Sequence, residues 1–334
     1  MTIFQPPSTP AAGIVDIGNR KQHFLDNLLI DEASRVSHYM FRPNKHAGNP
    51  IIVADRPWEQ GRSRGETGDV QLVGQTVLYD EEENLFKMWY LPSALPDGRR
   101  PWCYATSTDG FNWEKPDLGL IEFEGSKQNN IVEMLRGGGA AGEPNYYNVF
   151  KDPRDPDPQR RYKAQGEIHG PGGHQPPGGM VNAYSPDGLH WTYNNQAVVQ
   201  YPTDVADAST VLGWDPKKQK YVGYFRPGHP LTHEIDGSGH HRHIRTVGYA
   251  ESDDFEHWTP TRIMLAPDDG DRVDHQYQYF TAGICGEFYV GFLMIHKTHD
   301  QVWDVFLMSS RDGFHWNWVD RHVPFLGRGE IGTY

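Results

Sequence analysis

A seven-residue pattern that occurs four times constrains the fold of this 334-residue chain more than any other feature. Each copy has Ser first, Asp third and Trp last, and three copies have Gly directly after the Asp. The copies are STDGFNW at 107–113, SPDGLHW at 185–191, SDDFEHW at 252–258 and SRDGFHW at 310–316. Their tryptophans are 78, 67 and 58 residues apart, and self-similarity at such a period indicates repeated supersecondary units.

Similar sequence surrounds each copy. An apolar strand, a polar turn and a strand of alternating aromatics come before it, at 73–92, 147–167, 209–227 and 277–295. A third strand runs into the Ser and a fourth follows the Trp, whereas helical periodicity is almost absent. Four antiparallel strands per unit, repeated radially, predict an all-β fold of the β-propeller type.

The repeats predict a single propeller domain over 1–334. Blades are expected at about 66–120, 143–200, 204–266 and 274–322. We expect five blades of four antiparallel strands, with the fifth incomplete. The strands of this fifth blade would come from the N-terminal segment at 20–60 and from 323–334. Alternatively, a partner chain or a second copy in a homo-oligomer would complete the blade.

The repeated pattern is interpreted as structural. Asp-Gly favours a tight turn, because Gly accepts positive φ and Asp bonds nearby backbone N–H groups. Asp187 is therefore predicted to form a turn, and Trp191 to fill space between blades. Such turns mark the outer edge of a blade, so the functional residues are sought at the opposite, inner edge.

Composition excludes some classes of protein. With 31 Lys+Arg against 44 Asp+Glu, the net charge of −13 argues against a nucleic-acid partner. No apolar run approaches the ~20 residues of a membrane helix, and the N-terminus does not resemble a signal peptide. The chain as it stands is predicted to be soluble and cytoplasmic, or secreted or periplasmic if its first Met replaces a leader. Cys103 and Cys285 show no metal-ligand spacing.

The repeats resemble those of the five-bladed propeller glycoside hydrolases, including families 43, 32, 62, 117 and 130, and the turn is similar to the Asp-box of sialidases. The resemblance covers about Phe24 to Phe325. Its most specific strings are STDGFNWEKPDLGLIEFEGSKQNNIV, RYKAQGE and RTVGYAESDDFEHW, which resemble family-32/43-like bacterial glycosidases. The chain departs from family 32 in having no WMNDPNG, no RDP at a strand start and no EC pair, so activity of the invertase type is not expected.

The resemblance implies two or three carboxylates at the axial end where each innermost strand begins. Cleavage of a glycosidic bond needs one acid to protonate the leaving oxygen and a second carboxylate to activate water or attack the sugar. Asp69 is the expected base or nucleophile, with Asp207 pairing with it. The acid is left open among Glu143, Glu167, Asp274 and His275, with Asp271 in the same loop as the last two. A carboxylate separation of about 5 Å would indicate retention and roughly 6.5–9.5 Å inversion.

Further residues are predicted to bind substrate. Three kinds of side chain are expected to do so. They are acids near the strand starts (Glu66 and Glu330), arginines that can hold a carboxylate or sulfate (Arg226 and Arg245), and aromatics that can stack on sugars (Trp58 and Tyr277).

Histidine-rich loops at 169–174 and 229–243 lack metal-ligand spacing, so no metal site or cofactor is predicted. The resemblance leaves room for one axial divalent cation. The leading hypothesis is a hydrolase, a glycosidase cleaving an oligo- or polysaccharide. The alternatives are a non-catalytic carbohydrate-binding or scaffold propeller and one subunit of a split glycosidase.

Overall fold

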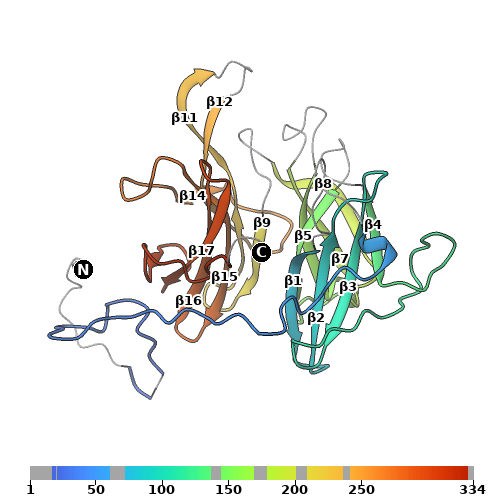
Figure 1. Ribbon diagram of the computed structural model, residues 1–334, viewed down its shortest axis with the longest axis horizontal. Helices are drawn as coiled ribbons and strands as arrows, with labels where there is room; N and C mark the ends of the chain where they lie inside the picture. The colour runs from blue at the N-terminus through green and yellow to red at the C-terminus, as the bar shows by residue number, and fades with distance from the viewer. Residues whose placement is uncertain are drawn as a thin grey trace. The chain divides into compact units, whose positions relative to one another are not determined.

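The computed structural model describes residues 17–19, 21–60, 72–136, 144–168, 179–200, 209–235 and 241–329. Within these ranges the strands form four four-stranded antiparallel sheets and one two-stranded ribbon (Figure 1). The helices of the described residues are two short 3-10 turns, η1 (Pro57–Glu59) and η2 (Pro158–Arg160). None of them has the length or apolar character to cross a membrane. The prediction of an all-β chain with almost no helix is confirmed.

Each sheet takes its strands in chain order. The first sheet contains β1 (Leu72–Asp80), β2 (Leu85–Pro92), β3 (Arg99–Ser107) and β4 (Ile131–Arg136). The second contains β5 (Pro144–Lys151), β6 (Tyr162–Ile168), β7 (Gly179–Ser185) and β8 (Thr192–Gln200). The third contains β9 (Ser209–Asp215), β10 (Lys220–Phe225), β13 (Val247–Ser252) and β14 (Arg262–Leu265). The fourth contains β15 (His275–Cys285), β16 (Phe288–Lys297), β17 (Val302–Ser310) and β18 (Asn317–Trp318). The ribbon pairs β11 (Gly228–Ile235) with β12 (His241–Arg245).

The chain divides into two compact units. Unit 1 comprises 1–44, 229–249 and 263–334, and unit 2 comprises 45–228 and 250–262. The first and second sheets therefore belong to unit 2, and the fourth sheet with the ribbon belongs to unit 1. Each unit is described by itself below.

A fifth four-stranded sheet is not present among the described residues, so the prediction of five blades is not confirmed. The strands expected at 20–60 do not form in 21–60, where the backbone is irregular apart from η1. An apolar run becomes a strand only when an edge with free backbone groups is available to pair with it. Near the C-terminus, Leu326 forms an isolated bridge with Val305 of β17, and 330–334 lie outside the described residues.

The repeated pattern forms the turn after the third strand of each sheet. In the second copy, Oδ1 of Asp187 accepts the backbone N–H groups of Leu189 and His190, both at 2.8 Å. Oγ of Ser185 accepts the N–H of Gly188 at 2.8 Å. Because the same bonds recur in the other three copies, the prediction that the Asp forms a turn is confirmed.

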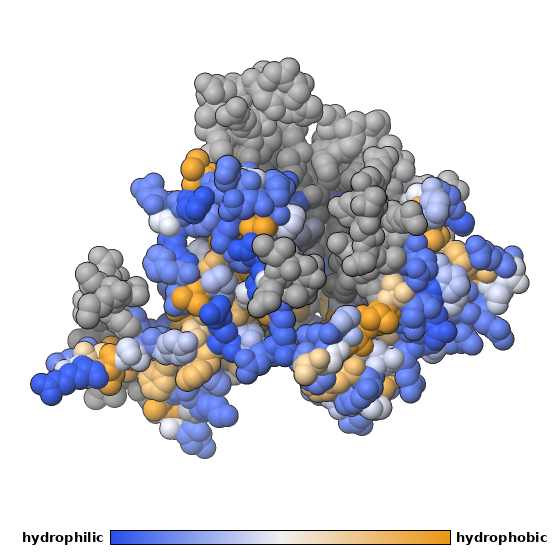
Figure 2. Space-filling view, in the orientation of Figure 1, coloured by the Kyte–Doolittle hydropathy of each residue, from blue (hydrophilic) through white to orange (hydrophobic). Residues whose placement is uncertain are grey.

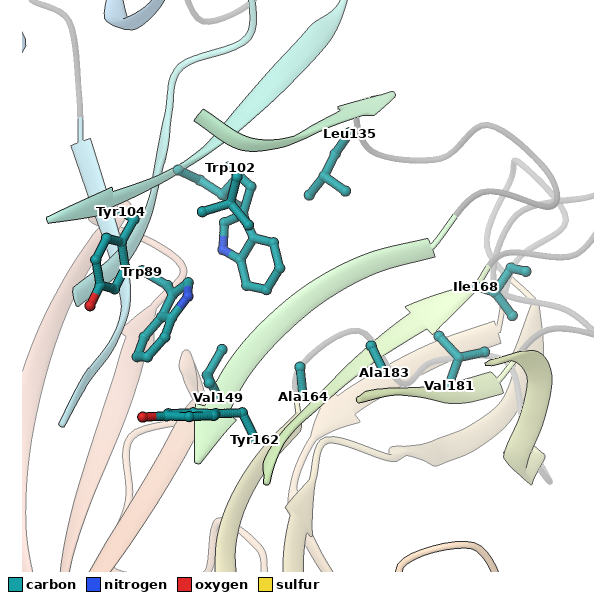
Figure 3. Close-up of a cluster of buried hydrophobic side chains, with 12 residues drawn as sticks. Trp89, Trp102, Tyr104, Leu135, Val149, Tyr162, Ala164, Ile168, Val181 and Ala183 are labelled. Carbon is teal, nitrogen blue, oxygen red and sulfur yellow. The ribbon is translucent and has the colours of Figure 1, made fainter. Parts of the chain in front are cut away.

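The second copy also packs against the preceding sheet. Nε1 of Trp89 in β2 donates to the carbonyl of Gly188 at 2.8 Å. The ring of Trp191 lies 5.4 Å from that of Trp102 in β3. Trp102 belongs to a buried cluster that the first two sheets share (Figure 3), and Trp191 packs against this cluster. The predicted packing of Trp191 between sheets is therefore confirmed.

Buried ion pairs join the sheets of unit 2 on the side where the first strand ends. Asp80, at the end of β1, accepts Nζ of Lys87 and the hydroxyl of Tyr162 in the next sheet, both at 2.8 Å. Asp152 follows β5 and accepts Nζ of Lys163 at 2.7 Å, and it also accepts the hydroxyl of Tyr221 in the sheet after it. A lone buried charge would cost several kcal/mol, so these complete sets fix how neighbouring sheets meet. On the outside of the molecule, hydrophilic residues cover much of the surface that Figure 2 shows in colour.

Candidate active site

Strand pairing defines one end of each sheet, at which the first strand begins and the second strand ends. We call it the leading end. In the second sheet Asn145 pairs there with Glu167, and in the third sheet Ser209 pairs with Phe225. Within unit 2, β1 contacts β5 and β5 contacts β9, so the first strands of successive sheets are neighbours. Side chains from different sheets can therefore converge at the leading ends of this unit.

Two ionisable side chains, one acidic and one basic, are buried at leading ends in unit 2. Glu167, near the end of β6, is 3% exposed. Arg226, directly after β10, is also 3% exposed. Taking an ion out of water costs several kcal/mol, so charges persist at such positions only where they interact strongly. The sequence predicted both, Glu167 as a catalytic residue and Arg226 as a substrate-binding residue.

A second group of polar side chains lies at the leading end of the fourth sheet, in unit 1. Oδ2 of Asp271 accepts three donors: the hydroxyl of Tyr277 at 2.8 Å, Nη2 of Arg321 at 2.8 Å and the backbone N–H of Asp268 at 3.0 Å. Its Oδ1 lies 3.5 Å from Nδ1 of His275. Three bonds thus fix one oxygen and direct the other at the imidazole.

The charge states around this carboxylate follow from its neighbours. Burial raises the pKa of Tyr277, and the bond to Asp271 adds to the shift, so the phenol stays protonated and donates. The hydrogen bond from Arg272, at 2.9 Å, lowers the pKa of Asp274 below its ordinary value. Asp274 is therefore ionised, and its Oδ2 is buried without a hydrogen bond from any described residue.

His275 is the most unusual member of this group. Its side chain is 13% exposed, and neither ring nitrogen makes a hydrogen bond within the part of the chain that the structure describes. Buried polar atoms without partners are rare in folded proteins. An imidazole can accept and donate a proton, and Oδ1 of Asp271 lies 3.5 Å from Nδ1 of this one, so the Asp271–His275 pair has the elements of an acid–base group.

The remaining predicted residues fall into three sets. Arg245, at the end of β12, donates Nη1 to Oε1 of Gln276 at 2.7 Å, which brings it to the same leading end as His275. Trp58 lies elsewhere, because it donates to Oδ1 of Asn130 at 2.8 Å beside the outer strand of the first sheet. Five predicted residues lie outside the described ranges: Glu66, Asp69, Glu143, Asp207 and Glu330.

Sequence reasoning missed Arg321 and Asp268. Arg321 also bonds Asp268 through both of its terminal nitrogens. No local pattern marks Arg321, which is 50 residues from Asp271 in the chain. Asp268 belongs to the acidic run DDGDRVD, whose density of carboxylates was the available indication.

Two further features do not extend the site. Across the described ranges no three His, Cys, Asp or Glu side chains are grouped to hold a metal ion, so these residues offer an axial cation no ligand set. A cavity of about 700 Å³ lies at the outer side of the fourth sheet, between Leu25–Leu28 and the turn of the fourth repeat. Its carboxylates are already engaged, Asp26 with Arg311 and Asp312 with its own turn, so we place no chemistry there.

Comparison with known proteins places the fold. No protein-family model matches the sequence, and no curated protein is similar enough in sequence to count as a relative. Among solved structures, the chain is similar to a BT0996–RGII complex, with 14% identity and a TM-score of 0.53 over 77% of this chain and 75% of the other. It is similar to a glycoside hydrolase with 15% identity and a TM-score of 0.53, over 81% and 79% of the two chains. The chain thus has the β-propeller fold found among glycoside hydrolases, here with four four-stranded sheets in its described part.

Proposed function

We propose that this chain is a glycoside hydrolase that cleaves a glycosidic bond in an oligo- or polysaccharide. The observation that carries the proposal is the carboxyl group of Glu167, which is buried at a leading end in a fold shared with glycoside hydrolases. Cleavage of a glycosidic bond needs a carboxyl group that gives a proton to the leaving oxygen, and Glu167 supplies one at this end of the sheet. The buried guanidinium of Arg226, at the equivalent end of the next sheet, supports binding of polar sugar groups.

The roles follow the two-carboxylate chemistry of such enzymes. In our proposal Glu167 is the general acid, Asp69 the base or nucleophile, and Asp207 the carboxylate that pairs with it. His275 is the competing acid, because its imidazole lies 3.5 Å from the carboxylate of Asp271 and has no hydrogen-bond partner among the described residues. Glu143 is the remaining candidate for this role. Asp274, also expected from the sequence, is disfavoured as an acid because the hydrogen bond from Arg272 lowers its pKa and keeps it ionised.

A screen against aryl-glycosides and natural glycans tests the proposal. Glu167→Gln keeps the shape of the side chain and removes its proton chemistry, so we expect activity to fall about 10²- to 10⁴-fold. Glu122→Gln is the matched control, because Glu122 is exposed and should tolerate the change. Asp69→Asn, Asp207→Asn and His275→Asn, in the same screen, separate the other assignments.

The pattern of losses decides among the roles. If Glu167→Gln retains full activity while His275→Asn abolishes it, the acid is His275. If none of the four substitutions affects a measured activity, the proposed site is wrong. Melting curves for each variant show whether a loss of activity reflects unfolding.

A non-catalytic carbohydrate-binding propeller is the second candidate. It is favoured by the absence of a fifth sheet from the described residues, since a wall of the site could then be missing. In that case sugars would bind at the leading ends without being cleaved, and Glu167→Gln would change affinity alone. Activity before and after treatment with EDTA tests the axial cation, and sizing of the native protein tests for a partner chain.

A further inference from the structure

Three side chains form a row across the leading end of the fourth sheet. Gln276 of β15 pairs with His296 of β16, and His296 pairs with Trp303 of β17. Residues paired directly across antiparallel strands point to the same face of a sheet. Arg245 continues this row beyond Gln276 through its 2.7 Å hydrogen bond. All four residues belong to unit 1 and none has a role in the proposed catalytic step.

Trp303 is held so that one face of its indole is available. Its ring stacks on the imidazole of His296 with centroids 4.7 Å apart and planes 12° from parallel. His296 is 8% exposed, whereas Trp303 is 44% exposed, a large value for such a big apolar side chain. His296 covers one face of the indole, and nearly half of the Trp303 side chain is still exposed to solvent. Sugar rings stack on aromatic side chains that are held in place and remain partly exposed to solvent.

Arg245 has no carboxylate partner among the residues that the structure describes. It is half-buried, its one hydrogen bond goes to the neutral amide of Gln276, and it forms no ion pair within the described residues. Burial lowers the pKa of Arg245, yet a guanidinium keeps its charge in proteins. A guanidinium without a carboxylate partner in the described ranges is unusual for a chain of net charge −13, because carboxylates are abundant. Gln276 fixes the side chain, and the remaining N–H groups can form a two-pronged contact with a planar anion.

We propose that this row binds an acidic oligosaccharide, with the carboxylate of a uronic-acid unit on Arg245 and another sugar ring of the same molecule on Trp303. Adjacent strands are about 4.8 Å apart, so the positions of Gln276 and Trp303 are separated by roughly 10 Å. This span exceeds one sugar ring, so the ligand is a disaccharide or longer. The inference rests on the proposed function in one respect, namely that the ligand is a carbohydrate.

Calorimetric titration with defined sugars tests the inference. The probes are digalacturonate, trigalacturonate and a glucuronic-acid-bearing xylo-oligosaccharide, each beside its carboxyl-reduced, neutral counterpart. The acidic member of a pair should bind about 10- to 100-fold more tightly, as expected for a charge-assisted pair. Arg245→Met should remove this preference, Arg245→Lys should restore part of it, and Arg56→Met, on the outer side of the first sheet, should leave it intact.

Variants of Trp303 test the stacking contact independently of Arg245. Trp303→Leu should weaken binding of acidic and neutral sugars by the same factor, whereas Trp303→Tyr should retain most of the affinity. Neutral sugars that bind as tightly as acidic ones, or a preference that survives Arg245→Met, would overturn the inference and leave the proposed function standing. Failure of all these sugars to bind would also overturn the inference, whereas the proposed function is decided separately by the screen against aryl-glycosides and natural glycans. Melting curves of the variants distinguish lost binding from lost folding.

Discussion

The glycine of the second repeat offers a sharp test of how the turns pack. Gly188 has φ +80°, and a Cβ built on it would lie 2.6 Å from Cζ2 of Trp89 and 3.4 Å from Cδ1 of Tyr162. Trp89 cannot easily move away, because it is 0% exposed and donates its Nε1–H to the carbonyl of Gly188 itself. Gly188→Ala therefore combines backbone strain with a collision in the core.

The size of the effect follows from these two terms. A non-glycine residue in the left-handed region costs about 1–2 kcal/mol. Forcing an extra methyl into a well-packed core costs about 1–3 kcal/mol more. Gly110 is the matched control, since it has φ +76° in the first repeat but its nearest neighbour, Phe86, would be 3.7 Å from the new Cβ. Gly110→Ala should thus show the strain term alone.

Urea unfolding of the two variants, followed by circular dichroism, measures the difference. Both glycines belong to unit 2, so both changes report on the same compact part of the chain. We expect Gly188→Ala to lower the free energy of unfolding by about 1–3 kcal/mol more than Gly110→Ala, with an unchanged dependence on urea. Equal losses for the two variants would refute the reasoning, because the contact with Trp89 would then contribute nothing.

Two further predictions concern pH. Burial alone would raise the pKa of Asp80. Hydrogen bonds from Lys151, Lys87 and Tyr162 have the larger effect, so the pKa is lowered. Asp80→Asn should therefore cost about 3–5 kcal/mol at neutral pH, and urea titrations should show the cost shrinking as pH falls below about 4. The hydrogen bond to the turn aspartate raises the pKa of His257, so its stabilisation is present below about pH 6.5 and lost as pH rises through the folded-state value. His257→Asn should remove that dependence, because Asn112 already makes the equivalent bond in the first repeat; stability that still falls over this pH range in the variant would contradict the assignment.

The repeats made most of the fold predictable. The bonds of each turn join residues two or three apart, as when Asp109 accepts the N–H groups of Phe111 and Asn112. Such contacts depend on local sequence alone, so the pattern revealed four units and most of their strands. It missed β4, which lies beyond the blade expected at 66–120, and the β11–β12 ribbon, which replaces a loop expected at 229–243. The fifth blade was not predictable in this way. Ile51 and Ile52 belong to an apolar run typical of a strand, yet 21–60 form none, because a strand needs a paired edge that no local pattern specifies.

The candidate site was only partly predictable, for the same reason. Asp274 and His275 were expected because they lie directly before a predicted first strand, and this position follows from the order of elements. Arg321, Asp268 and the stacking of His296 on Trp303 were not expected. These contacts depend on which strands pair, and in which register.

The sequence by itself determined the type of secondary structure and the turn at the end of each third strand. Those properties arise from neighbours a few residues apart. Only the tertiary structure decided that Asp271 turns one oxygen to His275, that Glu167 and Arg226 are buried, and that Arg245 has no carboxylate partner among the described residues. Burial and pairing of charges depend on residues tens of positions apart, and folding alone brings them together.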